Sequence, residues 1–155
     1  MHSVLFICSA NICRSPMAMG LLKIKVKDEA DDWKIESAGI WAYSGDPAAV
    51  NTQIIIKARG GDVSSHRSQP ITTSLVEAFN LILVMERGHK EALRAAFPEY
   101  APRIFLMSEM IGESLDIADP VGHPLEDYEH TSREIDLILD QGFEKISQLS
   151  KAEAV

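Results

Sequence analysis

Cysteine is scarce in this chain, and long apolar runs are missing. The 155 residues include two cysteines, Cys8 and Cys13, and one such close pair does not make the disulfide framework of a small secreted protein. No apolar stretch approaches the roughly 20 residues of a membrane-spanning helix. The run at residues 4–8 also lacks the basic flank and the cleavage site of a signal peptide. We therefore expect a cytoplasmic protein with no membrane partner.

Positive charge is also in short supply. Lysine and arginine total 15 against 23 aspartates and glutamates, which gives a formal net charge of -8. This balance lacks the basic footprint of a nucleic-acid-binding protein and should repel anionic membranes. The histidines show no standard metal-ligand spacing with the two cysteines, so we expect no metal and no other cofactor. An anionic substrate would need a local positive site.

The apolar residues that are present form alternating strands and helices. Buried or alternating apolar runs predict strands at residues 3–8, 33–38, 79–85 and 103–107. Helical spacing predicts helices at residues 15–28, 46–60, 86–96 and 125–149, with Ser15 and Asp46 as N-caps and a frayed tail at 150–155. The length suits one domain, residues 1–155, and the alternation predicts an α/β fold with a four-stranded parallel sheet. Such sheets bind ligands at the carboxyl ends of their strands, which points to the loops after strands one and four.

The loop after the first strand carries the residues of an anion site. It reads CSANICRSP from Cys8 to Pro16, with Cys8 and Arg14 six positions apart. Its backbone N–H groups can point inward as a nest, and the following helix adds the positive end of its dipole. The planar fork of Arg14 can hold two oxygens of a phosphate group. The alternative is a buried structural cysteine before a capped helix, but the convergence of strand, helix start and arginine favours the anion site.

A thiol in such a pocket is a candidate nucleophile. Positive charge and amide donors favour the thiolate of Cys8, which would attack phosphorus and form a phosphocysteine. Arg14 and the loop amides would stabilise the equatorial oxygens in the transition state, and water would then hydrolyse the intermediate. The Gly-Lys-Ser/Thr ending of a nucleotide-binding P-loop is missing.

The motif Cys-x-x-Asn-x-Cys-Arg-Ser-Pro resembles that of the low-molecular-weight protein tyrosine phosphatases, and the resemblance extends along nearly the whole chain. The segments 37–39, 65–68 and Asp119-Pro120 are similar to later motifs of that family. The resemblance implies a four-stranded parallel sheet with helices on both faces in a single domain. It also implies a phosphotyrosine-containing protein as substrate and inorganic phosphate as product.

Asp119 is the candidate general acid. Cleavage of a phosphate monoester needs a proton for the leaving oxygen, and a carboxylic acid beside the thiolate can supply it and later activate water. Asp119 lies in the loop after the fourth strand, where Pro120 favours an extended backbone. By itself Asp-Pro is as consistent with a simple turn, and it is the family resemblance that assigns Asp119 as the acid. Asp116 is the main rival.

Two positions depart from the pattern of the family. Val121 stands where an aromatic residue usually follows Asp-Pro, so the substrate wall is thinner or differently built there. Trp41 and Tyr43, in the loop after the second strand, are candidates for the aromatic contact, although core packing is the commoner fate of such residues. Ala10 replaces a glycine, and alanine would cost on the order of 1 kcal/mol if the φ angle there were positive.

Polar side chains are expected to support the phosphate loop, because inward N–H groups leave outward carbonyls that need donors. The resemblance implies a hydrogen-bonded supporting set of Asn11, Ser15, Ser37 and His66. An asparagine also tolerates the positive φ that such loops need. Cys13 is either a small buried residue or, as in the family, the thiol that protects an oxidised Cys8 by forming a disulfide.

Three other functions stand as alternatives. Phosphoarginine phosphatases share the fold but tend to carry Thr at the position of Ile12, and an apolar Ile12 suits a flat aromatic leaving group. Thioredoxin-coupled arsenate reductases need further cysteines, and none follows Cys13. A non-catalytic phosphate-binding module would need neither the Cys8 thiol nor the Asp119 acid. The expected substrate-binding residues are Ser9, Ala10, Asn11, Ile12, Cys13, Ser15, Trp41 and Tyr43.

Overall fold

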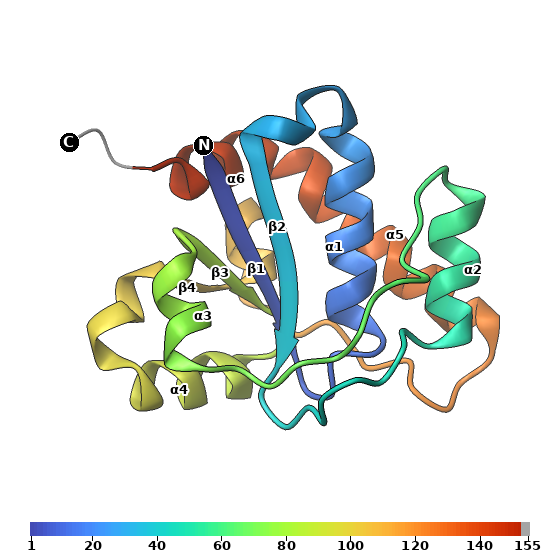
Figure 1. Ribbon diagram of the computed structural model, residues 1–155, viewed down its shortest axis with the longest axis horizontal. Coiled ribbons are helices and arrows are strands. Elements are labelled where there is room, and N and C mark those ends of the chain that lie inside the picture. Colours follow the sequence, from blue (N-terminus) through green and yellow to red (C-terminus); the bar gives the residue numbers. More distant parts are fainter. Residues whose placement is uncertain (153–155) are drawn as a thin grey trace.

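A four-stranded parallel sheet lies at the centre of the computed structural model, which describes residues 1–152 (Figure 1). The strands, in the order β2-β1-β3-β4, are β1 (His2–Cys8), β2 (Trp33–Gly39), β3 (Leu81–Val84) and β4 (Ile104–Leu106). Every neighbouring pair is parallel. The predicted fold class is confirmed, and each strand lies within one or two residues of its predicted bounds.

Helices cover both faces of the sheet (Figure 1). One face carries α1 (Arg14–Lys25), α5 (Leu125–Gln141) and α6 (Phe143–Ser150), with α2 (Val50–Ala58) packed against α1 and α5. The other face carries α3 (Thr73–Ala78) and α4 (Arg87–Ala96). Three short 3-10 helices complete the chain: η1 (Lys27–Asp32), η2 (Pro98–Arg103) and η3 (Met107–Ile111). Within residues 1–152, no helix is both long and apolar enough to cross a membrane.

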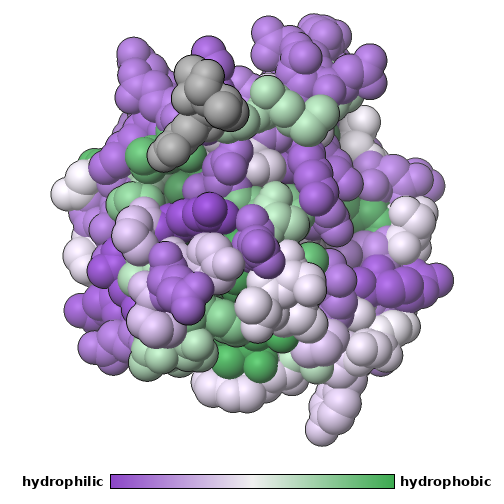
Figure 2. Space-filling view, turned by 60° about the vertical axis from the view of Figure 1, so that its left-hand side comes forward, coloured by the Kyte–Doolittle hydropathy of each residue, from purple (hydrophilic) through white to green (hydrophobic). Residues whose placement is uncertain are grey.

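Strand β1 separates the two halves of the core. Val4 and Phe6 face the cluster under α1, α5 and α6, whereas Leu5 and Ile7 face the cluster under α3 and α4. Both sets are fully buried, which explains why this segment reads as a continuous apolar run rather than an alternating one. Outside the core, hydrophilic side chains dominate the face shown in Figure 2, and smaller groups of hydrophobic ones lie between them.

The two predicted N-caps are wrong, because both segments are held by the phosphate loop or its neighbours. Helix α1 begins at Arg14 with Cys13 as its N-cap, since the Ser15 side chain contacts the Cys8 sulfur instead. Helix α2 begins at Val50 rather than near Asp46. The backbone of Asp46 pairs with Ser68. Residues 46–49 therefore form a connection without helical structure before α2.

The C-terminal segment also differs from its prediction. The single helix expected at residues 125–149 is two helices, because α5 ends at Gln141 and Gly142 begins a new direction. The tail expected to fray from Ser150 is ordered at its start: Ser150 is buried, its hydroxyl lies 3.0 Å from Nδ1 of His2, and Lys151 bridges to the same residue. Residues 153–155 lie outside the described part of the chain. Helix α3 was not predicted, although Thr72 caps it.

The break at Gly142 predicts a local stability effect. A Cβ atom there would lie 2.8 Å from the Ile138 carbonyl oxygen and 2.8 Å from Cβ of Met110, so Gly142→Ala should lower the free energy of unfolding by about 1–3 kcal/mol. Gly88→Ala is the matched control, because its Cβ would meet nothing within 4 Å and alanine favours the helix by up to about 1 kcal/mol. Urea unfolding midpoints measure both changes. An unaltered midpoint for Gly142→Ala would contradict the packing argument.

Candidate active site

The loop between β1 and α1 has its carbonyl groups turned outward. The carbonyls of Cys8 and Ser9 accept hydrogen bonds from the backbone N–H groups of Ile40 and Trp41, at 3.0 and 2.9 Å. The Ile12 carbonyl accepts from the N–H of Ala49 at 2.8 Å. Outward carbonyls leave the N–H groups facing inward, and none of the N–H groups of residues 9–13 donates a hydrogen bond within residues 1–152. The result is a nest of free donors beside Cys8.

Asn11 is the centre of the supporting network. It has a positive φ of 61°, as an asparagine at such a turn can. Its side-chain amide donates to the hydroxyls of Ser15 and Ser37 at 2.8 and 2.9 Å, and its side-chain oxygen accepts from the N–H of Gln69 at 3.0 Å. Its backbone carbonyl accepts from Nε2 of His66 at 2.8 Å. The structure thus brings together all four predicted supporting residues.

His66 is half-buried and supports the loop through its ring. Burial lowers the pKa of His66, and the nearby charges of Lys23 and Arg67 lower it further, although the bond to the Asn11 carbonyl works in the opposite direction. Because a carbonyl oxygen only accepts, Nε2 of His66 carries the proton in this contact. This contact holds the carbonyl of Asn11 turned away from the interior of the loop.

Cys8 lies at the base of the nest. Its sulfur is 2.9 Å from the Ser15 hydroxyl, whose oxygen already accepts from Asn11. The hydroxyl proton of Ser15 is thus free to be donated to the sulfur. Cys13 instead lies 3.3 Å from the Tyr128 hydroxyl in the core, and both thiols are free.

Arg14 is buried with its guanidinium held on one side by protein acceptors. Nη1 lies 2.7 Å from Oε2 of Glu86 and donates to the Ile117 carbonyl at 2.6 Å. Nη2 lies 3.5 Å from Oδ2 of Asp119, and Nε has no hydrogen-bond partner within the described residues. The fork therefore keeps its Nε and Nη2 edge available for two oxygens of an anion.

The structure separates the two candidate acids. Asp119 lines a small cavity of about 50 Å³ together with Cys8, Ala10, Ile12, Cys13 and Val121. Asp116 lies outside this cavity, because its carboxylate accepts hydrogen bonds from the backbone N–H and Nε of Arg87. These bonds also lower the pKa of Asp116, which makes it a poor proton donor. The geometry favours Asp119 as the acid.

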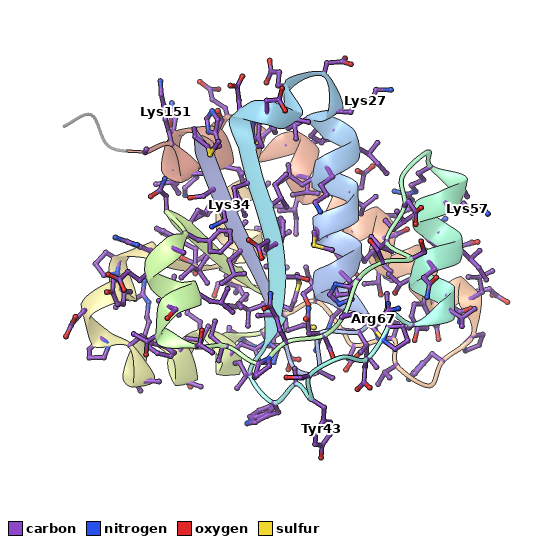
Figure 3. The ribbon with its side chains drawn as sticks, in the orientation of Figure 1. Lys27, Lys34, Tyr43, Lys57, Arg67 and Lys151 are labelled. Atoms are coloured by element: carbon purple, nitrogen blue, oxygen red, sulfur yellow. The ribbon has the colours of Figure 1, made fainter. Side chains whose placement is uncertain are left out.

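The aromatic candidates lie at the same end of the sheet but not in that cavity. Trp41 and Tyr43 are 70% and 81% exposed, and the Tyr43 side chain points away from the molecule in Figure 3. Core packing is therefore excluded for both.

Ala10 does not have a positive φ, so the backbone strain considered for an alanine at this position is absent. A hollow of about 510 Å³ elsewhere, lined by Asn80, Arg103 and Lys151 among others, contains none of the predicted site residues.

Sequence reasoning missed two titratable residues of this site, Glu86 and His89. Both follow β3, whose loop was not expected to contribute. Nε2 of His89 lies 2.9 Å from the Ser9 hydroxyl, and Glu86 pairs with Arg14. Ligands bind at the carboxyl ends of parallel strands. If the strand order had been known, this rule would have pointed to the loop after β3 as well, because β3 lies next to β1. Across residues 1–152, no group of three or more His, Cys, Asp and Glu side chains is arranged to hold a metal ion.

Comparison with known proteins agrees with this geometry. The family model described as low molecular weight phosphotyrosine protein phosphatase matches residues 3–152. The chain belongs to this family. A crystal structure of a low molecular weight protein tyrosine phosphatase from T. tengcongensis superposes with a TM-score of 0.88 at 38% identity, covering 94% of this chain and 99% of that one.

Relatives of this phosphatase carry two kinds of name. A protein-arginine-phosphatase of Geobacillus stearothermophilus is 33% identical over 94% of this chain and 96% of the relative. A probable low molecular weight protein-tyrosine-phosphatase EpsP of Ralstonia nicotianae is 36% identical over 95% and 97%. The relatives thus agree on protein phosphatase chemistry and differ in the phosphorylated residue that their names give.

The two cysteines of the phosphatase should differ in reactivity. Burial raises the pKa of the Cys13 thiol to about 11, against the lowering effect of its bond to Tyr128, so only on the order of one thiol in 10⁴ is ionised at pH 7. Iodoacetamide at pH 7 should therefore alkylate Cys8 and leave Cys13 free, and inorganic phosphate should protect Cys8. Peptide mass spectrometry locates the label. Comparable labelling of Cys13 in the folded protein would contradict this prediction.

Proposed function

We propose that this phosphatase hydrolyses phosphotyrosine-type phosphate monoesters in proteins through a phosphocysteine on Cys8. The observation that carries the proposal is the single cavity that Cys8 and Asp119 share beside the free loop N–H groups. A binding module would need the donors but not a thiol and a carboxyl group in the same cavity. We further propose that residues 1–155 form one catalytic domain that acts in the cytoplasm and releases inorganic phosphate.

In the first step, the Cys8 thiolate attacks phosphorus while the P–O bond to the tyrosine oxygen breaks. The leaving oxygen takes a proton from the Asp119 carboxylic acid, which becomes a carboxylate. The loop N–H groups and the free edge of Arg14 stabilise the equatorial oxygens, where charge is concentrated in the transition state. Tyrosine leaves with its hydroxyl restored, and Cys8 carries the phosphoryl group.

In the second step, water attacks phosphorus and the S–P bond breaks. The Asp119 carboxylate removes one proton from the water, which regenerates the acid, and inorganic phosphate leaves. The departing sulfur recovers its negative charge next to the Ser15 hydroxyl. This contact lowers the cost of expelling a thiolate, because a hydrogen bond to the charged form stabilises it. The cycle needs no cofactor.

An aryl phosphate assay tests the mechanism. Cys8→Ser should abolish turnover, and Asp119→Asn should lower kcat by about 10²–10⁴-fold, the usual contribution of a general acid. Asp116→Asn is the matched control, because Asp116 is bonded to Arg87 and lies outside the cavity; its kcat should stay within about threefold of wild type. Activity in Cys8→Ser would overturn the mechanism. An effect of Asp116→Asn as large as that of Asp119→Asn would overturn the acid assignment.

Phosphoarginine is the second candidate substrate, because relatives that span nearly the whole chain are named protein-arginine-phosphatases. The cavity nevertheless presents Ile12 and Val121, and these apolar side chains suit an aryl ring better than a charged guanidinium. We expect kcat/KM for a phosphotyrosine peptide to exceed that for the matched phosphoarginine peptide by more than tenfold. Ile12→Thr should narrow this ratio. A ratio that favours phosphoarginine in the wild type would reverse the substrate assignment.

A further inference from the structure

His89 occupies a position where an apolar side chain would be expected. It lies in the first turn of α4, a short amphipathic helix whose buried residues are His89 and Leu93, four positions apart. Leu93 packs into the core cluster with β3 and β4. His89 is only 3% exposed, yet it lies one turn closer to the phosphate loop and makes polar contacts. A buried polar side chain in place of a core residue requires a partner.

The partners of His89 belong to two different parts of the anion site, the phosphate loop and the carboxylate beside Arg14. Its Nε2 is 2.9 Å from the hydroxyl of Ser9, which directly follows Cys8 in the loop. The same Nε2 is 3.6 Å from Oε2 of Glu86. That carboxylate oxygen is also the one that lies 2.7 Å from Nη1 of Arg14. A continuous set of contacts therefore joins the loop to the guanidinium through one imidazole.

The charges around His89 indicate its protonation state. Burial lowers its pKa and Arg14 lowers it further, while the carboxylates of Glu86, Asp116 and Asp119 raise it. Nδ1 is buried without a partner within the described residues, so a second proton would create an unsatisfied buried N–H. A neutral ring with its proton on Nε2 donates to the Ser9 hydroxyl and faces the Glu86 carboxylate favourably. The opposite tautomer would place a lone pair against that carboxylate.

We propose that His89 is a positioning residue that holds Ser9 and Glu86 at fixed places, so that the loop amides and Arg14 bind oxygens of the same phosphoryl group. The role rests on the proposed function of the site. Glu86 and the Ile117 carbonyl occupy Nη1 of Arg14, which turns the Nε and Nη2 edge toward the anion. His89 fixes Glu86 relative to the loop, and with it the angle of the fork.

This alignment matters most in the transition state. The three equatorial oxygens of the transferring group spread into one plane, and donors from the loop and from Arg14 must meet them together. A tetrahedral phosphate in the ground state tolerates a small displacement of either set. Loss of the His89 contacts should therefore lower kcat more than it raises KM, which is the signature of an interaction made in the transition state.

Three variants test the proposal with p-nitrophenyl phosphate as substrate and with vanadate and inorganic phosphate as inhibitors. His89→Leu should lower kcat by about tenfold with KM within about threefold of wild type. Vanadate reaches the trigonal bipyramidal geometry of the transition state, so its Ki should rise about tenfold, whereas that of phosphate should change little. His89→Gln keeps an N–H donor near the place of Nε2 and should restore most of the kcat. His130→Gln, an exposed histidine on α5, is the control and should match wild type.

A double-mutant cycle with Ser9→Ala locates the effect. Ser9→Ala removes the partner of His89 without disturbing the core. It should therefore change kcat and the vanadate Ki by the same factors as His89→Leu. The double variant Ser9→Ala/His89→Leu should show no further change. Wild-type kcat and vanadate Ki in Ser9→Ala, or full additivity in the double variant, would overturn the proposal. If His89→Leu fails to fold, the proposal is tested by the other two variants: Ser9→Ala should lower kcat, and His89→Gln should keep most of it.

Nitrogen-15 NMR tests the ring without any turnover. The neutral tautomer protonated at Nε2 should persist for His89 at pH 7, and Ser9→Ala should shift its Nε2 resonance. A positively charged ring or the Nδ1–H tautomer would overturn the proposal. Failure of the wild type to hydrolyse p-nitrophenyl phosphate would instead overturn the proposed function, since the NMR readout does not depend on catalysis.

Discussion

Five carbonyl groups of the phosphate loop are each held by a donor from outside it, and the chemistry of the site depends on this arrangement. The donors are the N–H groups of residues 40, 41 and 49, the His66 ring and the Thr52 hydroxyl. Each bond turns one peptide plane so that its carbonyl faces the protein, and the inward N–H groups follow as a geometric consequence. The segment 40–66 thus shapes the anion site by holding the outer side of the phosphate loop. Gly39 permits this close approach, because a Cβ there would lie 2.6 Å from the Ser9 carbonyl oxygen.

The strand order determines which loops meet at the anion. In the order β2-β1-β3-β4, the chain leaves β1 toward one side and returns to β3 on the other, so the loops after these two strands diverge and leave a crevice. Cys8 lies at the end of β1, and Glu86 and His89 follow β3. The loop after β4 closes the third side and brings Asp119 within 3.5 Å of Arg14. The nucleophile and the clamp therefore come from the loop after β1 and the acid from the loop after β4, and a single sheet edge brings these loops together.

Local chemistry made part of this site predictable from the sequence. Cys8, Arg14 and Asn11 lie within one loop whose residue types identify an anion nest, and four strands were recognisable from apolar runs. Contacts between distant segments were not predictable: Ser9 and His89 are 80 positions apart, and no periodicity indicates that they touch. The wrong helix starts have the same origin, because the Ser15 hydroxyl contacts the Cys8 sulfur and the backbone N–H and carbonyl of Asp46 pair with Ser68. The N-cap preference of these residues therefore does not determine where the helices begin.

The charge balance around Arg14 indicates how the site combines binding with release. The Glu86 carboxylate lies beside the Arg14 guanidinium, and Asp119 adds a second carboxylate once it has donated its proton, so the arginine contributes little net charge to the pocket. Attraction for a phosphate dianion must come mainly from the loop N–H groups and the N-terminus of α1, whose dipoles are fixed in direction. Fixed dipoles stabilise the transition state effectively, because its equatorial oxygens spread their charge into the plane that the dipoles face. They stabilise a tetrahedral phosphate ion less, because its oxygens fit this plane poorly. An acidic protein can thereby stabilise the transition state strongly while holding its phosphate product weakly, since interactions made equally with both would not increase kcat.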